Sequence, residues 1–301
     1  MTKVKAWISA FRLRTLPLAL SSIIMGSFLA AYYNAFNWSI LILASFTTLF
    51  LQVLSNLAND YGDTVNGADH ADRKGPDRMV QTGAISLTSM RMAIILFSVF
   101  SLLSGLLLIY VAFGSASAYV SLFFFVLGLA AIAAAMKYTM GNNPYGYNGL
   151  GDIFVLIFFG IVGVAGSFYL YTNYFDWKVL LPAFSVGFLS SGVLNLNNMR
   201  DEESDRAAGK NTLVVKNGIK WAKTYHSFLI VAAILNIAIF AIINGFGLFQ
   251  YIFLLGIPLF IRHLNVVKKA EEASDFDPEL KKLALSTLVF VILFGVGLVV
   301  F

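Results

Sequence analysis

Long apolar segments alternate with polar loops along the whole chain, and this pattern predicts nine membrane-spanning helices. About 20 consecutive apolar residues span the hydrocarbon core of a bilayer. The apolar segments are approximately 16–34, 38–58, 92–112, 116–136, 153–172, 179–198, 226–244, 246–262 and 284–301. The eighth is short and contains Pro258. The longer polar loops cover 59–91, 137–152, 199–225 and 263–283. We therefore expect an all-α polytopic membrane protein with a single domain over residues 1–301.

The composition supports the same interpretation. Of the 301 residues, 58% are hydrophobic and only 12% are charged, whereas soluble domains carry about 25% charged residues. The first apolar segment is long and lacks the small-residue cleavage pattern of a signal peptide, so we expect it to be retained. The chain has no cysteine, and we therefore expect neither disulfides nor thiolate metal sites.

Charged residues gather on one side of the predicted membrane protein. With nine spans, the N-terminus and the four longer loops share a side, which holds every Lys and Arg except Lys178 and every acid except Asp176. The positive-inside rule makes this side cytoplasmic. We expect a multi-pass protein of the inner (cytoplasmic) membrane whose chemistry faces the cytoplasm. Because this placement explains the formal charge of +5, we expect the lipid bilayer as a partner, with no nucleic acid and no obligatory protein partner.

Short acidic motifs end the second and the sixth spans. The first motif comprises Asn59, Asp60, Asp63 and Asp69, and the second comprises Asn198, Asp201 and Asp205. Each follows an Asn-rich span end and leads into a basic stretch that contains glycine. Four spans separate the two motifs, so both copies point the same way across the membrane. A parallel repeat around one central cavity would bring the motifs face to face; chance similarity is the alternative explanation.

The spacing and chemistry of these motifs suit magnesium. Asn59 and Asp63 are four residues apart, as are Asp201 and Asp205, and a helix puts such pairs on one face. Both sets offer only oxygen ligands, and Mg²⁺ binds through one or two carboxylates while keeping water and substrate phosphate in its shell. Two such sets could hold a diphosphate through two bridging ions. We expect the remaining cytoplasmic acids to cap helices or solvate loops: Asp72, Glu202, Glu203, Glu271, Glu272, Asp275, Asp277 and Glu279.

Basic residues lie where a diphosphate would need them. Arg78 follows the first motif, Arg206 and Lys210 follow the second, and Arg14 precedes the first span. Guanidinium groups can grip phosphate oxygens bidentately, and Lys acts as a point charge. The alternative is a purely topological role, which we expect for most other lysines, including Lys281 and Lys282.

The loop over 137–152 is rich in Gly and Pro, which is typical of turns. It is either a plain connector or a substrate-binding rim with Lys137, Tyr145 and Asp152 as polar contacts. The three histidines (His70, His226 and His263) show no metal-ligand spacing, and we expect them to be incidental surface residues.

The motifs together resemble the paired aspartate-rich motifs of the UbiA superfamily of membrane prenyltransferases. Residues 59–63 with Asp69, and the stretch 200–213, carry this resemblance, which covers the whole chain. The segments 13–17 and 144–152 are similar to the branch that acts in menaquinone biosynthesis. One departure is Gly67, which stands where several members have their next aspartate.

The resemblance implies nine transmembrane helices around a central cavity and a site that uses Mg²⁺. The residues that it implies as metal ligands are Asn59, Asp63, Asp69, Asp201 and Asp205. The expected catalytic residues are Asn59, Asp60, Asp63, Asp201 and Asp205. The residues expected to bind substrate are Arg14, Arg78, Lys137, Tyr145, Asp152, Asn198, Arg206 and Lys210.

The activity that the resemblance implies is transfer of a polyprenyl group from polyprenyl diphosphate to 1,4-dihydroxy-2-naphthoate, with loss of CO₂ and diphosphate. One alternative is a sister enzyme with another acceptor, such as 4-hydroxybenzoate or a glyceryl phosphate ether. A secondary transporter is disfavoured because transporter acids lie near mid-span, whereas these lie at span ends. A nonenzymatic lipid-binding protein would not need two repeated metal-ligand sets.

Overall fold

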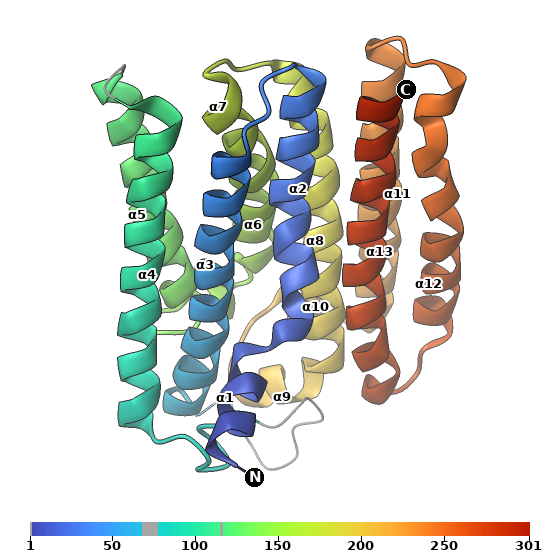
Figure 1. The fold of residues 1–301 in the computed structure, drawn as a ribbon. Helices are drawn as coiled ribbons and strands as arrows, with labels where there is room; N and C mark the ends of the chain where they lie inside the picture. Colours follow the sequence, from blue (N-terminus) through green and yellow to red (C-terminus); the bar gives the residue numbers. More distant parts are fainter. Residues whose placement is uncertain (1, 68–77, 115–116) are drawn as a thin grey trace.

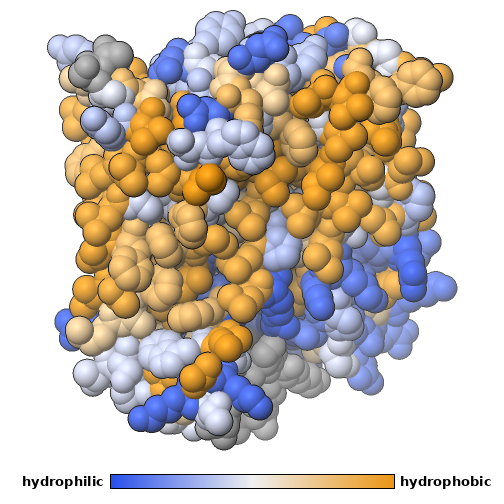
Figure 2. Space-filling model, in the orientation of Figure 1, coloured by the Kyte–Doolittle hydropathy of each residue, from blue (hydrophilic) through white to orange (hydrophobic). Residues whose placement is uncertain are grey.

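The computed structural model describes residues 2–67, 78–114 and 117–301. Within these ranges, nine helical stretches are long and apolar enough to cross a membrane, which confirms the predicted number. The long helices stand side by side in one bundle, with the N-terminus and the C-terminus at opposite ends (Figure 1). An apolar band covers the middle of the visible face, and hydrophilic side chains gather below it (Figure 2).

The first half of the chain forms α1 (Lys3–Phe11), η1 (Leu13–Thr15), α2 (Leu16–Tyr32), α3 (Trp38–Val65), α4 (Leu87–Phe113), α5 (Ala118–Lys137), η2 (Tyr145–Asn148), α6 (Gly151–Val155), η3 (Leu156–Gly166) and α7 (Ser167–Thr172). The second half forms η4 (Trp177–Val179), α8 (Leu180–Arg200), α9 (Glu202–Ala207), α10 (Leu213–Asn217), α11 (Ile219–Ile243), η5 (Leu248–Gly256), α12 (Ile257–Lys269) and α13 (Ala273–Val300).

Several helices continue past the apolar segments at their polar ends. Helix α3 runs on to Val65 and so includes the whole 59–63 motif, while α13 begins at Ala273, well before its apolar part. Asp275 supports the start of α13 by accepting backbone N–H bonds from Glu271 and Glu272, both at 3.0 Å. Hydropathy therefore predicted the apolar part of each helix but underestimated the helix lengths, because polar residues with good capping partners can extend a helix beyond its apolar part.

Two spans contain helical geometry that the apolar pattern did not reveal. In the fifth span, the π-helix η3 lies between α6 and α7. The eighth span begins as the 3₁₀ helix η5 and continues as α12, whose first turn contains Pro258. Proline is tolerated there because the first N–H groups of a helix have no partner within the helix. The proline therefore marks a change of helix type inside one span.

Small residues let the central helices approach closely. A Cβ atom added at Gly160 of η3 would lie 2.7 Å from the carbonyl oxygen of Ala183 and 3.1 Å from Cα of Gly187, both in α8. Such contacts require glycine, as expected for helix interfaces in membranes. The close contact fixes η3 against α8 on one side of the cavity described below.

We predict that Gly160→Val lowers the thermal unfolding midpoint in detergent, because the new side chain would push η3 away from α8. Overpacking of this kind costs about 1–3 kcal/mol. Gly128→Val in α5 is the matched control, since a Cβ atom at Gly128 has no other atom within 4 Å. Equal midpoints for the two variants, measured by tryptophan fluorescence during heating, would contradict the proposed contact.

Candidate active site

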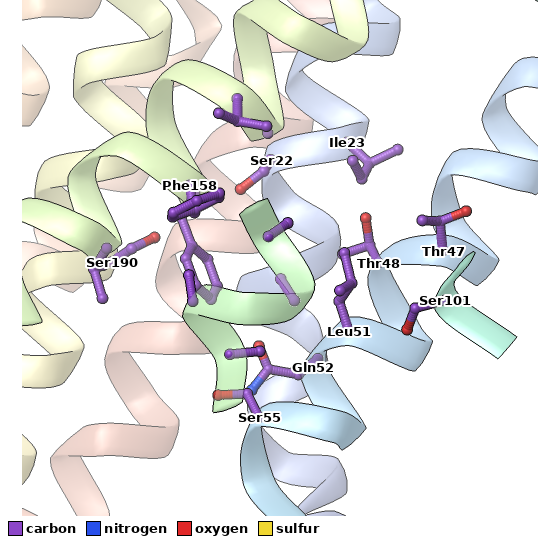
Figure 3. A pocket seen from close by; sticks show the side chains of 18 of the residues that line it. Ser22, Ile23, Thr47, Thr48, Leu51, Gln52, Ser55, Ser101, Phe158 and Ser190 are labelled. Atoms are coloured by element: carbon purple, nitrogen blue, oxygen red, sulfur yellow. The ribbon is translucent and has the colours of Figure 1, made fainter. Parts of the chain in front are cut away.

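A cavity of about 410 Å³ opens between α2, α3, α5, η3, α8 and α13. Along α3 its wall extends from Asn59 to Ala44, which is about 22 Å at 1.5 Å per residue. Figure 3 shows Thr48, Gln52 and Ser55 of α3 on one side of this space and Phe158 of η3 on the other. The cavity therefore runs from the polar end of the bundle into its apolar interior.

Asp63 of the first acidic motif lies buried beside this polar end. Its side chain is 2% exposed and forms an ion pair with Arg78. The Tyr147 hydroxyl donates to Oδ1 of Asp63 at 2.8 Å. Burial and the nearby Asp63 carboxylate raise the pKa of Tyr147, so the hydroxyl keeps its proton for this bond.

Asn59, one helical turn before Asp63, lines the cavity. Its side-chain oxygen accepts from the Thr139 hydroxyl at 3.2 Å, and its backbone carbonyl accepts from Nη1 of Arg78 at 2.8 Å. Arg78 therefore touches both Asn59 and Asp63. These contacts explain why a residue 15 positions after Asp63 belongs to the same site.

The glycine of the first motif is required by packing. A Cβ atom at Gly62 would lie 2.6 Å from the carbonyl oxygen of Thr139, closer than real Cβ contacts allow. Only glycine lets α3 approach the start of the 138–150 loop this closely. The approach brings Tyr147 to Asp63 and Thr139 to Asn59.

Asp60 has a different environment from its neighbours in the motif. Its two oxygens accept backbone N–H bonds from Met79 at 3.0 Å and from Val80 at 3.3 Å. Asp60 thus anchors the segment that carries Arg78. These contacts give Asp60 a positioning role, and its expected catalytic role stays a prediction.

The second acidic motif meets the first around Lys210. The Lys210 ammonium lies 3.4 Å from Oδ1 of Asp205 and above the rings of Tyr138 and Tyr147, at 6.0 and 5.6 Å from their centroids. Burial alone lowers the pKa of Lys210, but the carboxylates of Asp63 and Asp205 outweigh burial and raise the pKa. The ammonium therefore pairs directly with Asp205 of the second motif and lies within the electrostatic influence of Asp63 of the first, which agrees with the expectation that the motifs face each other.

Two buried oxygens of the second motif have no hydrogen-bond partner in the described structure: Oδ2 of Asp205 and Oδ1 of Asn198. Burial raises the pKa of Asp205 to about 6, and the nearby Asp201 and Asp63 carboxylates act in the same direction. Unsatisfied buried oxygens are costly. A bound cation or a protonated ligand is the kind of partner that such oxygens lack.

Asp201 is held by Arg200, which donates to Oδ1 through Nε and to Oδ2 through Nη2, each at 2.8 Å. Arg200 also donates to Asn197, a cavity residue, at 2.8 Å and to Asp277 of α13 at 2.7 Å. Asp277 was expected to cap a helix or solvate a loop. Its side chain is 38% exposed, but α13 begins early enough that the carboxylate also pairs with Arg200 at the end of α8.

The described residues do not form a complete set of metal ligands, but they offer oxygens that suit a divalent cation. Among the described residues, no group of three His, Cys, Asp or Glu side chains is arranged to hold a metal ion. Instead, Arg78 and Lys210 lie against the carboxylates. The orphaned oxygens of Asp205 and Asn198 nevertheless fit Mg²⁺, which keeps ligands from water and substrate. Asp69, the remaining expected ligand, lies outside the described residues.

The other residues expected at the site lie on the cavity wall, at a buried position away from it, or on the exposed surface. Arg14 and Tyr145 line the cavity; Tyr145 stacks on Phe154 with ring centroids 3.9 Å apart. Asp152 is buried but accepts from Tyr225 of α11 at 3.2 Å and is not part of the cavity wall. Lys137 is exposed at the end of α5. The Arg206 side chain is 59% exposed and pairs with Glu202.

The expectation of incidental surface histidines was wrong for His226 and His263. Their Nε2 atoms are 2.8 Å apart, and Nδ1 of His263 lies 2.6 Å from Oε2 of Glu279. All three side chains are buried, so Glu279 is not a solvated acid either. They come from α11, α12 and α13, and only the packing of these helices brings them together. His70 lies outside the described residues.

Sequence reasoning missed several residues that the fold brings to the site. Tyr147, Asn197 and Arg200 contact the acidic motifs, and Lys281 lines the cavity. Arg200 stands beside Asp201 in the sequence, and Tyr147 stands in the Gly- and Pro-rich loop, so the sequence around each could have marked it as a site residue. Nothing in the sequence near Lys281 could do so, because its position depends on how α13 packs against α8.

Comparisons with known proteins point to one family. Residues 19–277 match the UbiA prenyltransferase family. The chain is 44% identical over 301 residues to a Haemophilus influenzae protein named 1,4-dihydroxy-2-naphthoate octaprenyltransferase, covering 99% of this chain and 97% of that one. Its fold is similar to a UbiA homologue from Aeropyrum pernix K1, with TM-score 0.69, 17% identity and coverage of 96% and 98%. It is also similar to an Archaeoglobus fulgidus UbiA homologue solved with DMAPP and Mg²⁺, with TM-score 0.60, 16% identity and coverage of 96% and 98%.

We predict that Lys210→Met lowers the thermal unfolding midpoint, because Asp205 loses its buried counter-ion. Removing one partner of a buried pair costs about 3–5 kcal/mol. The double variant Lys210→Met/Asp205→Asn should recover part of the loss, since it also removes the uncompensated charge. Lys220→Met, at an exposed position of α11, is the control. A midpoint for Lys210→Met equal to that of the control would show that the shared ammonium is not needed.

Proposed function

The chain belongs to the UbiA prenyltransferase family, and we propose that it transfers a polyprenyl group from polyprenyl diphosphate to 1,4-dihydroxy-2-naphthoate. The products are demethylmenaquinol, diphosphate and CO₂. The observation that carries this proposal is the junction of two acidic motifs and two buried cations with a long, largely apolar cavity. The name of the Haemophilus influenzae relative, 1,4-dihydroxy-2-naphthoate octaprenyltransferase, supports the naphthoate acceptor.

The diphosphate group would bind where Arg78 and Lys210 meet the two motifs. Both cations now pair with carboxylates, and both can exchange those partners for phosphate oxygens. The ligands proposed for Mg²⁺ are Asn59, Asp63, Asp201 and Asp205, with Asp69 as a candidate outside the described residues. Bound Mg²⁺ would supply neutralisation of the departing diphosphate. The Archaeoglobus fulgidus homologue, solved with DMAPP and Mg²⁺, supports this part of the proposal.

The reaction begins when the allylic C–O bond breaks and its electron pair leaves with the diphosphate. Arg78 and Lys210 stabilise that developing negative charge in a buried, water-poor site. The allylic carbon becomes positive, and aromatic faces can stabilise it; Tyr145, Phe154 and Phe158 all line the cavity. Exclusion of water by the same wall protects the cation from hydrolysis.

The electron-rich naphthoate ring then attacks the allylic carbon at the ring position that carries its carboxylate. A C–C bond forms at this ring carbon. The bond between the ring carbon and the carboxylate then breaks, its electron pair stays with the ring and restores aromaticity, and CO₂ leaves. Arg14 and Lys281 line the cavity and are the cations that we assign to the acceptor carboxylate before it leaves. The prenyl tail would follow the apolar part of the cavity into the bundle.

We place the motif end of the bundle at the cytoplasmic face of the inner membrane. The positive-inside rule supports this orientation, because nearly all Lys and Arg residues lie on that side. A soluble acceptor would then enter from the cytoplasm, and the apolar product would leave into the bilayer.

The direct test is an acceptor panel with purified protein, Mg²⁺ and a long allylic diphosphate. We expect diphosphate release and a prenylated product with 1,4-dihydroxy-2-naphthoate, detected by mass spectrometry. Turnover of 4-hydroxybenzoate or a glyceryl phosphate ether, with none of the naphthoate, would reject the proposed acceptor. Turnover of no acceptor by folded protein would reject the enzymatic proposal.

We predict that Asp63→Asn and Asp205→Asn each lower kcat by about 10²–10³, the loss typical for removing one charge-stabilising group. Asp152→Asn should stay near wild type, because the amide oxygen can still accept from Tyr225, and Asp152 pairs with neither Arg78 nor Lys210. Initial rates at saturating substrates measure these effects. A large loss for Asp152→Asn with little loss at Asp63 would reverse the assignment.

A further inference from the structure

The guanidinium group of Arg200 links the second acidic motif to α13. The Arg200 side chain is 2% exposed, and a buried guanidinium is costly unless it is paired with opposite charge and hydrogen-bonded. Four of its five N–H donors have acceptors in the structure: two on Asp201, one on Asn197 and one on Asp277. Arg200 thus joins two carboxylates from helices that are far apart in the sequence.

The other oxygen of Asp277 lies at ion-pair distance from a second guanidinium, that of Arg14. Oδ1 of Asp277 accepts from Arg200 at 2.7 Å, and Oδ2 lies 3.6 Å from Nη1 of Arg14. Arg14 lines the cavity, as does Asn197 on the other side of Arg200. One carboxylate on α13 therefore connects the acceptor end of the cavity with the second acidic motif.

The electrostatic consequence concerns Asp201. A carboxylate paired bidentately with one guanidinium is nearly neutralised, which makes it a weak partner for a further cation. Asp277 shares the same guanidinium, so Asp201 retains more of its negative charge while Arg200 still fixes its orientation. Partners that orient a metal-binding carboxylate in this way typically contribute 10- to 100-fold in affinity or activity.

We propose that Asp277 and Arg200 are positioning residues that keep Asp201 charged and correctly oriented for the metal–diphosphate group. Asp277 also places Arg14 in the cavity wall, so the same residue positions parts of both substrate sites. This inference rests on the proposed function, in which Asp201 is a metal ligand. A purely structural bridge between α8 and α13 would change stability and leave cation affinity unchanged.

The experiment measures Mn²⁺ binding by electron paramagnetic resonance in the presence of inorganic diphosphate, without any acceptor. The variants are Asp277→Asn, Arg200→Lys, Arg14→Gln and Glu271→Gln. Asp277→Asn removes the carboxylate charge that Arg14 and Arg200 share. Arg200→Lys keeps the positive charge but cannot bind Asp201 through two parallel N–H groups. Glu271→Gln is the matched control: it makes the same charge change at an exposed position just before α13.

We expect Asp277→Asn and Arg200→Lys each to weaken Mn²⁺ binding by about 10-fold or more, and Glu271→Gln to bind like wild type. Arg14→Gln should bind Mn²⁺ like wild type and raise the KM for the acceptor. Wild-type Mn²⁺ affinity in both Asp277→Asn and Arg200→Lys would overturn the inference while leaving the proposed function intact. If wild-type protein itself bound no Mn²⁺ with diphosphate, the metal part of the proposed function would fail as well.

Size-exclusion chromatography in detergent checks that each variant is folded. If Asp277→Asn does not fold, Asp277→Glu replaces it, since the longer side chain keeps the charge but displaces it from Arg14 and Arg200. Weakened Mn²⁺ binding by folded Asp277→Glu would support the positioning role, and unchanged binding would contradict it.

Discussion

The arrangement of the site depends on one buried ammonium group, that of Lys210, which interacts with Asp63 and Asp205. These carboxylates belong to motifs separated by four membrane spans, and neither could be buried at low cost alone. Lys210 and Arg78, the direct ion-pair partner of Asp63, together compensate this burial and define a small region where charges of both signs meet at the end of a long cavity. A substrate with a diphosphate head and an apolar tail matches both parts of this region.

Close backbone contacts maintain this charge cluster. Gly62 lets α3 lie against Thr139, which brings the 138–150 loop and Tyr147 to Asp63. Asp60 anchors the backbone beside Arg78. Gly160 fixes η3 against α8 on the opposite side of the cavity. The acidic motifs therefore contain both the charges and the residues that position them, which explains why Gly62 and Asp60 stand among the charged residues.

The sequence was sufficient to predict what depends on local composition: nine spans, and two acidic motifs at corresponding span ends that resemble one family. It also identified Lys210 and Arg78 near those motifs, as expected diphosphate contacts, but it did not predict their ion pairs with Asp205 and Asp63. It could not show contacts that form between distant helices. Asp277 and Glu279 looked like solvated acids, and His226 and His263 looked incidental, because their partners lie on other helices. Lys137 and Arg206 looked suitable for phosphate, but the ends of α5 and α9 leave them exposed.

The central claim is that Asp63 and Asp205 bind the same metal–diphosphate group, and the absence of cysteine from the chain permits a direct test. Thiolate ligands prefer soft cations such as Cd²⁺ over Mg²⁺. We predict that Asp63→Cys and Asp205→Cys each lose turnover with Mg²⁺ and regain part of it with Cd²⁺, while Asp152→Cys shows no such exchange of metal preference. Failure of Cd²⁺ to restore turnover in either folded variant, or equal restoration at Asp152→Cys, would contradict the account.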